Sequence, residues 1–297
     1  MSKPVRLALC QTAPRLGDVK RNLAQVLHWA ERARASGAGL AVFPELALSG
    51  YFLKDLVADC ALKEGSPALR SLEKASKGLD LLVGGVFEDD RHRFFNALFF
   101  LSRGRLAGIY RKIYLPTYGM FDEGRYFAAG SEVPVFRGPA GAFGCLLCED
   151  AWHAVLPLTA ALSGATLLVV SSSSPARSPL VAPRGAREDM RERLDITRTW
   201  QRVTRTWAQT LGLAVAYCNR VGFEEGVGFW GGSELVSPQG EALAQAPLMT
   251  EHLLVAEWKP ALARRSRVAT PLLRDEKVDL DARLLAGLAG WKVGGQK

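Results

Sequence analysis

The sequence predicts a mixed α/β protein in which helices pack outside β-sheets. Strand-length apolar runs alternate with helix-like runs along the chain. The runs Leu40–Phe43 and Leu167–Val170 are continuously apolar and adjoin helix-like runs, which is typical of strands buried on both faces. Phe95–Leu101 and Leu106–Lys112 are joined by the short turn Arg103-Gly104, which indicates an antiparallel hairpin. Sheets covered by helices satisfy both patterns.

The expected elements follow one another along the whole chain. We expect strands at Val5–Gln11, Gly39–Pro44, Leu79–Phe87, Phe95–Leu101, Leu106–Lys112, Val133–Phe136, Ala142–Cys148, Thr166–Ser171, Leu213–Asn219, Ser233–Val236 and Leu253–Trp258. We expect helices at about Asp18–Ala35, Pro67–Lys77, His153–Leu162 and Ala186–Leu211. Asp18 suits the N-cap of the first helix, because Asp is among the preferred capping residues.

Nothing in the composition divides the chain, so we expect one domain over residues 1–297. No Pro/Gly/Ser-rich linker and no internal repeat interrupts the pattern. The segment Ser171–Arg187 carries four consecutive serines and three prolines, which predicts a long loop of the kind that often borders a binding site.

The longest apolar runs are too short to cross a membrane, and the first residues lack the features of a signal peptide. We therefore expect a cytoplasmic protein with no membrane contact.

The net charge of +8 does not by itself indicate a nucleic-acid partner. The basic residues between Arg184 and Arg205 alternate with four acidic ones, a pattern typical of a solvated helix face. No helix-turn-helix, zinc-finger or aromatic RNA-binding motif accompanies the charge, so nucleic-acid binding is not expected.

The cysteines and histidines argue against a disulfide framework and against a metal site. Five cysteines at positions 10, 60, 145, 148 and 218 are an odd and sparse set, which predicts free thiols. Cys145 and Cys148 have C-x-x-C spacing, but residues three apart on a strand point to opposite faces. No second Cys/His pair completes a zinc site, and the four histidines are scattered. We expect no metal and no other cofactor.

Three reactive side chains fall where strands are expected to end. Glu45, Lys112 and Cys148 each come at the carboxyl end of a strand, and ligand sites in α/β sheets lie at such ends. A thiol becomes a good nucleophile when a base removes its proton, which Glu45 could do. Lys112 could stabilise the negative charge that develops in acyl transfer. A helix expected shortly after Cys148 would place its N-terminus near the sulfur and favour an anion there.

Each of these residues also has a purely structural interpretation. Taken alone, Glu45 could cap a turn, Lys112 could be a solvated strand-end charge, and Cys148 could be a buried core thiol. The serine run Ser171–Ser174 could suggest a serine nucleophile, but the chain has no G-x-S-x-G elbow.

At these residues the sequence resembles the nitrilase superfamily of carbon–nitrogen hydrolases over nearly its whole length. The resemblance implies a four-layer α-β-β-α sandwich, a Glu-Lys-Cys triad of Glu45, Lys112 and Cys148, and a thioester acyl-enzyme. The segments that carry it, in order, are Phe43-Pro44-Glu45-Leu46 with Ser49-Gly50-Tyr51, Tyr110-Arg111-Lys112-Ile113-Tyr114-Leu115-Pro116, Cys148-Glu149-Asp150-Ala151-Trp152, and Asn219-Arg220-Val221-Gly222 followed by Gly232-Ser233.

Within the superfamily, two segments resemble the glutaminase domain of glutamine-dependent NAD synthetase. They are the stretch from Leu115 to Phe127, which holds Tyr118 and Glu123, and the motif Cys148-Glu149-Asp150-x-Trp152. The resemblance implies that Glu123 lies beside the triad, where a second carboxylate would couple the titration of the first. It also implies a substrate pocket that uses Tyr51, Tyr118, Glu149 and Trp152.

The resemblance stops short of a complete NAD synthetase. The chain ends at Lys297 without the S-G-G-x-D-S phosphate loop of an ATP-pyrophosphatase domain, so we expect that it cannot make NAD alone. It would either supply ammonia to a separate synthetase subunit or act as a free-standing amidase. The expected substrate is a small-molecule amide, glutamine or a related ω-amide, with N-carbamoyl amines and nitriles as alternatives. A non-catalytic binding or regulatory protein of the same fold is the alternative from another class, and the intact triad residues oppose it. Homo-oligomers are usual in the superfamily.

Overall fold

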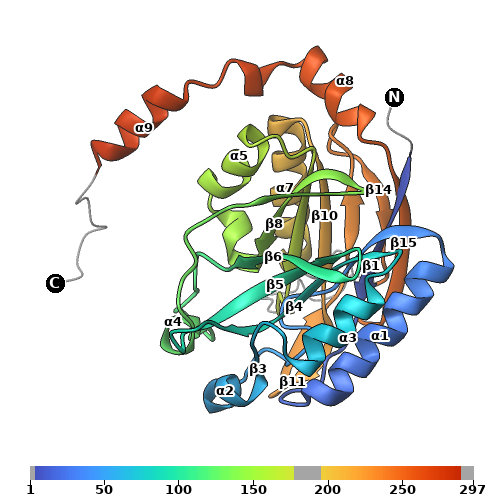
Figure 1. Cartoon of the computed structure of the whole chain (residues 1–297). Coiled ribbons are helices and arrows are strands. Elements are labelled where there is room, and N and C mark those ends of the chain that lie inside the picture. Colours follow the sequence, from blue (N-terminus) through green and yellow to red (C-terminus); the bar gives the residue numbers. More distant parts are fainter. Residues whose placement is uncertain (1–3, 177–194, 289–297) are drawn as a thin grey trace, which may run out of the picture.

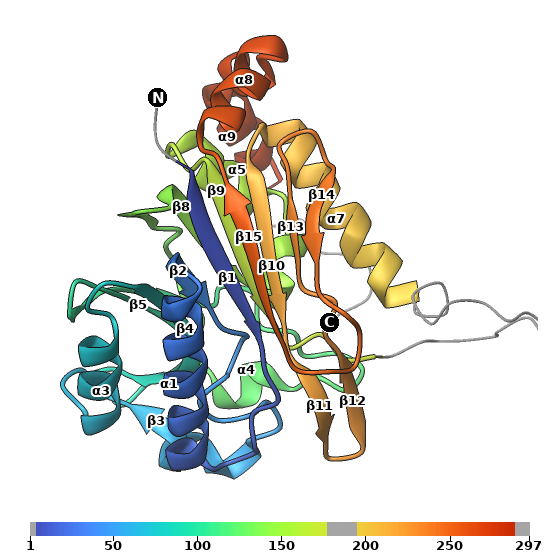
Figure 2. The same cartoon turned by 90° about the vertical axis from the view of Figure 1, so that its right-hand side faces the viewer.

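The computed structural model describes residues 4–176 and 195–288, and it arranges them as a four-layer sandwich. Helices α1 (Val19–Ala35) and α3 (Pro67–Ala75) cover one sheet, and helices α5 (Val155–Leu162) and α7 (Asp195–Leu211) cover the other. Figures 1 and 2 show the two sheets packed face to face between these helix layers. The α-β-β-α architecture expected from the resemblance is confirmed.

Each sheet has a parallel centre and antiparallel edges. The first sheet has the order β15 (His252–Trp258), β1 (Val5–Gln11), β2 (Ala38–Val42), β4 (Asp80–Glu88), β5 (Phe94–Ser102) and β6 (Arg105–Arg111), with β3 (Ala61–Leu62) paired to β4. The second sheet has the order β14 (Ala242–Gln245), β13 (Glu234–Val236), β10 (Ala214–Asn219), β9 (Leu167–Ser172), β8 (Gly141–Leu147) and β7 (Val135–Gly138). The neighbours β1–β2–β4 and β8–β9–β10 are parallel, which aligns their carboxyl ends.

Successive side chains of a strand point to opposite faces of its sheet, so each strand contributes to two different cores. On β1, Leu7 and Leu9 belong to the core between the sheets, while Ala8 and Cys10 belong to the core beneath α1 and α3. Aromatic rings fill the layer between the sheets near β5 and β8, where Phe100 and Phe143 meet edge to face. The continuously apolar strands of the sequence are therefore buried on both faces, as predicted.

The structure corrects several predicted boundaries. Ser171 and Ser172 belong to β9, so the predicted loop cannot begin at Ser171. Residues 173–176 follow the strand, whereas the part of the predicted loop over residues 177–187 and the predicted helix start at Ala186 lie outside the described residues. Periodicity also missed short or exposed elements: α2 (Val57–Cys60), α4 (Glu123–Tyr126), β11 (Val221–Glu224), β12 (Val227–Trp230), β14, α8 (Ala261–Ala269), α9 (Val278–Ala286) and the short 3₁₀ helices η1 (Lys54–Leu56), η2 (Cys148–Trp152) and η3 (Leu272–Arg274).

The last elements leave the body of the sandwich. Helix α8 packs through Ala263, but no residue of α9 is buried, and Figure 1 shows α9 standing away from the four layers. In the described part of the chain, no helix is long and apolar enough to span a membrane.

Candidate active site

One edge of the sandwich collects the residues that follow β2, β6, β8 and β9. Glu45 follows β2, Lys112 comes directly after β6, and Cys148 comes directly after β8. The residues after β9 join the sheets here, because the Ser173 amide donates to Glu45 Oε2 at 2.8 Å and the Ser173 hydroxyl donates to the Glu45 carbonyl at 2.9 Å. The predicted convergence of strand ends is therefore what the structure shows.

Lys112 lies at the centre of a buried charge cluster. Its Nζ donates to Glu45 Oε1 and to Glu123 Oε1, each at 2.7 Å, and the lysine side chain is fully buried. A buried charge is tolerated when opposite charges surround it. Burial acts to lower the pKa of Lys112, but Glu123 and Glu45 outweigh it and raise this pKa well above its usual value. Lys112 is therefore a fixed ammonium.

Further hydrogen bonds hold the Glu45 carboxylate in one orientation. The Asn96 amide donates to Oε1 at 2.8 Å from β5, and the Ser173 amide donates to Oε2 from the opposite sheet. Glu45 is fully buried, so these partners and Lys112 replace the water that a carboxylate normally binds. Asn96 and Ser173 were not singled out from the sequence, since an Asn within a strand and one serine in a run of four carry no distinctive pattern.

Cys148 stands at the turn between β8 and the short 3₁₀ helix η2. Its φ of +42° lies in the left-handed region, where a non-glycine residue typically costs about 1–3 kcal/mol. The side chain is only partly buried. Burial and the nearby Glu45 raise the pKa of the Cys148 thiol, and Lys112 opposes the rise. The resting group is thus a protonated thiol that needs a base, rather than a stored thiolate.

The structure corrects the expected helix N-terminus beside Cys148. The turn that begins there is the five-residue helix η2, and α5 starts only at Val155. The macrodipole grows with the number of aligned peptide units, so this short 3₁₀ helix offers less of it than the expected α-helix would. Lys112 is the positive group that faces the thiol.

Glu123 lies beside the cluster, at the start of α4, as the resemblance implied. The Tyr51 hydroxyl donates to the same Oε1 that accepts from Lys112. Burial raises the pKa of Glu123 to about 7, Glu45 adds to the rise, and Lys112 and Tyr51 oppose it. The second carboxylate can therefore change its charge near neutral pH.

The remaining predicted substrate-binding residues lie at the more open side of the site. The Tyr118 hydroxyl donates to Glu149 Oε2 at 2.9 Å, and Tyr118 is 58% exposed. Trp152 is 40% exposed and packs edge to face against Trp200. Tyr51, in contrast, is buried. The structure thus brings Tyr118 and Glu149 together and places Tyr51 deeper, against Glu123.

Asp150 is a structural residue of the site that sequence reasoning did not assign. Its Oδ1 accepts from the Ile113 and Tyr114 amides, and its Oδ2 accepts from the Tyr110 hydroxyl and the Leu147 amide. Burial raises the pKa of Asp150 to about 6, although Lys112 and these hydrogen bonds oppose the rise. The carboxylate ties the segment that carries Lys112 to the turn that carries Cys148.

A buried ion pair supports Tyr51 from the hairpin β11–β12. Glu224 Oε1 accepts from the Tyr51 and Phe52 amides at 2.7 and 2.6 Å, and Glu224 Oε2 accepts from Arg220 Nη1 at 2.8 Å. Both charged side chains are nearly inaccessible, and the Arg220 guanidinium also lies over the Phe229 ring. The motif Asn219-Arg220-Val221-Gly222 was noted in the sequence, but its partner Glu224 was not.

The two cysteines of the C-x-x-C spacing occupy different environments. Cys145 is fully buried within β8, among residues between the sheets, whereas Cys148 lies beyond the strand end. All five cysteines are free. Over residues 4–176 and 195–288, no cluster of His, Cys, Asp or Glu has an arrangement that could hold a metal ion.

The fold and the residues at this edge define the class of protein. Residues 6–268 match the carbon-nitrogen hydrolase family, and the chain belongs to this family. It is therefore a hydrolase of carbon–nitrogen bonds other than peptide bonds, and the resemblance to carbon–nitrogen hydrolases is confirmed.

Particular relatives give the comparison more detail. The chain is 33% identical to the glutamine-dependent NAD(+) synthetase of Thermotoga maritima over 259 residues, which are 86% of this chain and 42% of the relative. It is 39% identical to that of Mycobacterium bovis over 193 residues, which are 58% of this chain and 28% of the relative. This chain thus spans less than half the length of these curated relatives.

Solved structures agree with the fold. Glutamine-dependent NAD+ synthetase from Acinetobacter baumannii superposes with a TM-score of 0.74 at 27% identity, over 88% of this chain and 47% of that one. A carbon-nitrogen hydrolase from Helicobacter pylori superposes with a TM-score of 0.78 at 23% identity, over 96% and 99% of the two chains. The second likeness, at that identity, concerns the fold alone.

Proposed function

We propose that this hydrolase is a cysteine-dependent amidohydrolase that releases ammonia from a small-molecule amide, with L-glutamine or a related ω-amide as substrate. The observation that carries the proposal is the buried cluster in which Lys112 bridges Glu45 and Glu123 beside the protonated thiol of Cys148. A thiol, a carboxylate base and a fixed cation at one sheet edge are the groups that acyl transfer needs.

The geometry supports a two-step reaction through a thioester. Glu45 takes the proton of Cys148 as the sulfur attacks the amide carbon, and the Lys112 ammonium stabilises the oxyanion of the tetrahedral intermediate. The intermediate collapses when Glu45 gives its proton to the leaving nitrogen, which departs as ammonia. A water molecule, deprotonated by Glu45, then attacks the thioester, and proton return to sulfur releases the carboxylic acid and restores the thiol.

Glu123 and the residues of the more open side take supporting roles in this proposal. Glu123, held by the Tyr51 hydroxyl, keeps Lys112 charged and in place. Tyr118, Glu149 and Trp152 contact the part of the substrate that lies away from the scissile carbonyl. The Tyr118 hydroxyl occupies Glu149 Oε2, and Glu149 Oε1, which lies 3.7 Å from His153 Nε2, is the oxygen that accepts from a substrate amino group in this proposal.

The similarity to glutamine-dependent NAD(+) synthetases favours glutamine among the possible amides. In this proposal the ammonia serves a separate synthetase subunit, and a free-standing amidase is the alternative arrangement. N-carbamoyl amines and nitriles remain alternative substrates, since the same nucleophile can attack them. A homo-oligomer is part of the proposal.

The test is ammonia release by the purified full chain without ATP. L-glutamine is compared with a matched ω-amide that lacks the α-amino group, and N-carbamoyl amines and simple nitriles complete the panel. We expect turnover of glutamine to exceed that of the ω-amide. Clear turnover of the ω-amide or of a carbamoyl amine with rejection of glutamine would remove the glutaminase assignment. No turnover of any compound, with no acylation of Cys148, would instead favour a non-catalytic protein of this fold.

A further inference from the structure

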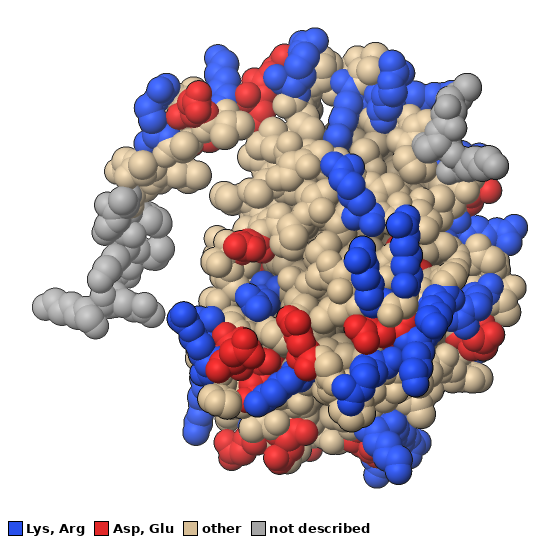
Figure 3. All heavy atoms as spheres, viewed as in Figure 1, with Lys and Arg blue, Asp and Glu red and all other residues tan. Residues whose placement is uncertain are grey.

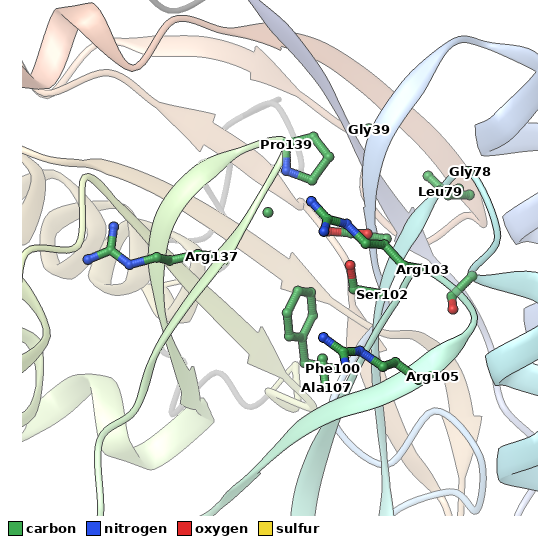
Figure 4. Close-up of a pocket in the computed structure, with 13 residues that line it drawn as sticks. Gly39, Gly78, Leu79, Phe100, Ser102, Arg103, Arg105, Ala107, Arg137 and Pro139 are labelled. Carbon is green, nitrogen blue, oxygen red and sulfur yellow. The ribbon is translucent and has the colours of Figure 1, made fainter.

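A hollow of about 620 Å³ lies at the end of the sandwich opposite the active site. It is bordered by the residues where β2 and β4 begin, by the β5–β6 hairpin and by β7, whereas Glu45 follows the far end of β2 (Figure 4). Its volume falls within the range of pockets that bind small molecules. No step of the proposed hydrolysis uses this hollow.

Glycine keeps one wall of the hollow close to its buried carboxylate. A Cβ atom at Gly138 would lie 2.3 Å from Asp80 Oδ2, so no other residue fits there without moving Asp80. Asp80 is only 5% exposed, and its Oδ2 has no hydrogen-bond partner among the described residues. A buried acceptor without a partner is costly, and a donor group on a ligand would satisfy it.

Cationic side chains face this carboxylate from the hairpin. Figure 4 shows Arg103 and Arg105 reaching into the hollow, while Arg137 lines its rim and turns outward. In the described part of the chain, none of these three arginines lies within ion-pair distance of an acidic side chain. Figure 3 shows basic side chains gathered over the face where the hairpin lies. Burial raises the pKa of Asp80, and Ser102 and Arg103 oppose that rise.

The turn gives no local reason for an arginine at position 103. Arg103 and Gly104 both have positive φ, at +54° and +80°, and the two-residue turns with this geometry prefer Asn, Asp or Gly. Arg103 therefore occupies a backbone position that its residue type does not favour. Guanidinium groups are well suited to phosphate, because they present paired donors to its oxygens.

We propose that this hollow binds a phosphate monoester whose carrier bears hydroxyl groups, a ligand of the sugar-phosphate class. Arg103 and Arg105 hold the phosphate, and the Asp80 carboxylate turns toward the hollow to accept from a ligand hydroxyl. The site is separate from Cys148, so the proposal does not depend on the hydrolytic function.

The test is isothermal titration of the full chain with ribose 5-phosphate, inorganic phosphate and ribose. We expect ribose 5-phosphate to bind with a Kd below about 1 mM at about 0.1 M ionic strength. Inorganic phosphate should bind about tenfold more weakly, because it lacks the hydroxyl that reaches Asp80. Ribose should not bind. Absence of ribose 5-phosphate binding under these conditions would overturn the proposal.

Substitutions of the residues that line the hollow test whether ribose 5-phosphate binds there. Arg103→Asn/Arg105→Gln keeps a residue suited to positive φ at the turn, and it should weaken ribose 5-phosphate at least about tenfold. The matched control Arg264→Gln/Arg265→Gln removes the same charge from exposed positions of α8 and should leave binding unchanged. Asp80→Ala removes the acceptor and should bring ribose 5-phosphate down to the affinity of inorganic phosphate. Equal losses in the two double variants would mean that only net charge matters, and the site would have to be abandoned.

Discussion

At the residue scale, the main feature is that burial and the charged neighbours together set the protonation states of the catalytic candidates. Lys112 is held charged between two carboxylates, while the Cys148 thiol is held neutral. An ammonium bound to a carboxylate base, with a neutral thiol nearby, is the ground state that general-base attack requires. The sequence supplied the residue types and their strand-end positions, but it could not give these states, since they arise from partners distant in the chain.

Cys148→Ala should abolish turnover, with a loss of at least about 10³-fold in kcat, because no thioester can form without the sulfur. The matched control is Cys145→Ala, at the buried cysteine within β8, three residues before Cys148. It should lower the free energy of unfolding by roughly 1–2 kcal/mol and leave the chemistry intact. Steady-state kinetics and urea denaturation measure the two effects. Similar loss of activity in both variants would contradict the assignment of Cys148 as nucleophile.

The Glu123 carboxylate predicts how activity depends on pH. Its pKa is raised to about 7, so Glu123 takes up a proton as the pH falls through neutrality, and kcat/KM should fall on that acid side. Tyr51→Phe removes a hydrogen bond that favours the charged carboxylate. The pKa of Glu123 should then rise, and the acid limb of the profile should move to higher pH. Glu45 and Lys112 act on the same carboxylate, and Glu123 in turn acts on Cys148, so the measured midpoint belongs to the cluster.

A Tyr118→Phe variant serves as the control for this profile, since the Tyr118 hydroxyl bonds to Glu149 and not to Glu123. It should affect KM for the amide more than the position of the acid limb. An unchanged profile in Tyr51→Phe would show that the Tyr51 hydroxyl does not control the charge of Glu123.

At the element scale, long periodic segments were predictable and short supporting ones were not. Helix α1 and strands β1, β4 and β10 carry strong apolar patterns, and each was predicted to within a few residues. The hairpin β11–β12 was missed, because its residues are chosen for partners elsewhere in the fold. Arg220, just before β11, and Glu224, its last residue, pair in the interior and hold the Tyr51 backbone. The sequence around Arg220 and Glu224 contains no pattern that predicts a contact with residues so far away in the chain.

Arg220→Met should strongly destabilise the protein, because it leaves Glu224 buried without its cation. Breaking a buried ion pair in this way typically costs about 3–5 kcal/mol. Arg220→Met/Glu224→Gln should recover part of that loss, since both charges are then absent and the Gln oxygen can still accept from the Tyr51 and Phe52 amides. Urea denaturation of both variants measures the recovery.

The pair Arg93–Asp89, at the surface and with the arginine half exposed, has the same four-residue spacing and provides the control. Arg93→Met should leave the urea midpoint nearly unchanged, because water solvates the remaining carboxylate. A double variant at positions 220 and 224 that is no more stable than Arg220→Met alone would show that Arg220 stabilises the hairpin by packing rather than by charge.

At the scale of the whole molecule, the sequence predicts the layers better than it predicts the surfaces. Alternation and continuous apolar runs indicate which strands are covered, because burial of apolar area dominates the folding free energy. They do not indicate what covers α9, whose apolar side chains Val278, Leu280, Leu284 and Leu285 are exposed. Val155 and Leu162 on α5 are exposed as well. A second copy of the chain is the partner we expect for these faces.

Leu280→Glu/Leu284→Glu should therefore convert an oligomer into a monomer without unfolding the sandwich, since no residue of α9 is buried. Light scattering after size-exclusion chromatography measures the mass, and circular dichroism checks the fold. Arg283→Glu, on the same helix, is the control and should leave the mass unchanged. A wild-type chain that is already monomeric would contradict the expected oligomer.

The Ser173 contacts with Glu45 have a consequence for how the enzyme loses activity. The proposed base is carried by one sheet and oriented by the backbone of the other, so neither sheet alone can assemble a working site. Partial opening between the layers would remove the base from its orientation before the helices melt. Residual activity in denaturant should therefore follow the fraction of molecules in which both sheets are packed together. Activity should be lost at a denaturant concentration no higher than the one at which the circular dichroism of the helices is lost.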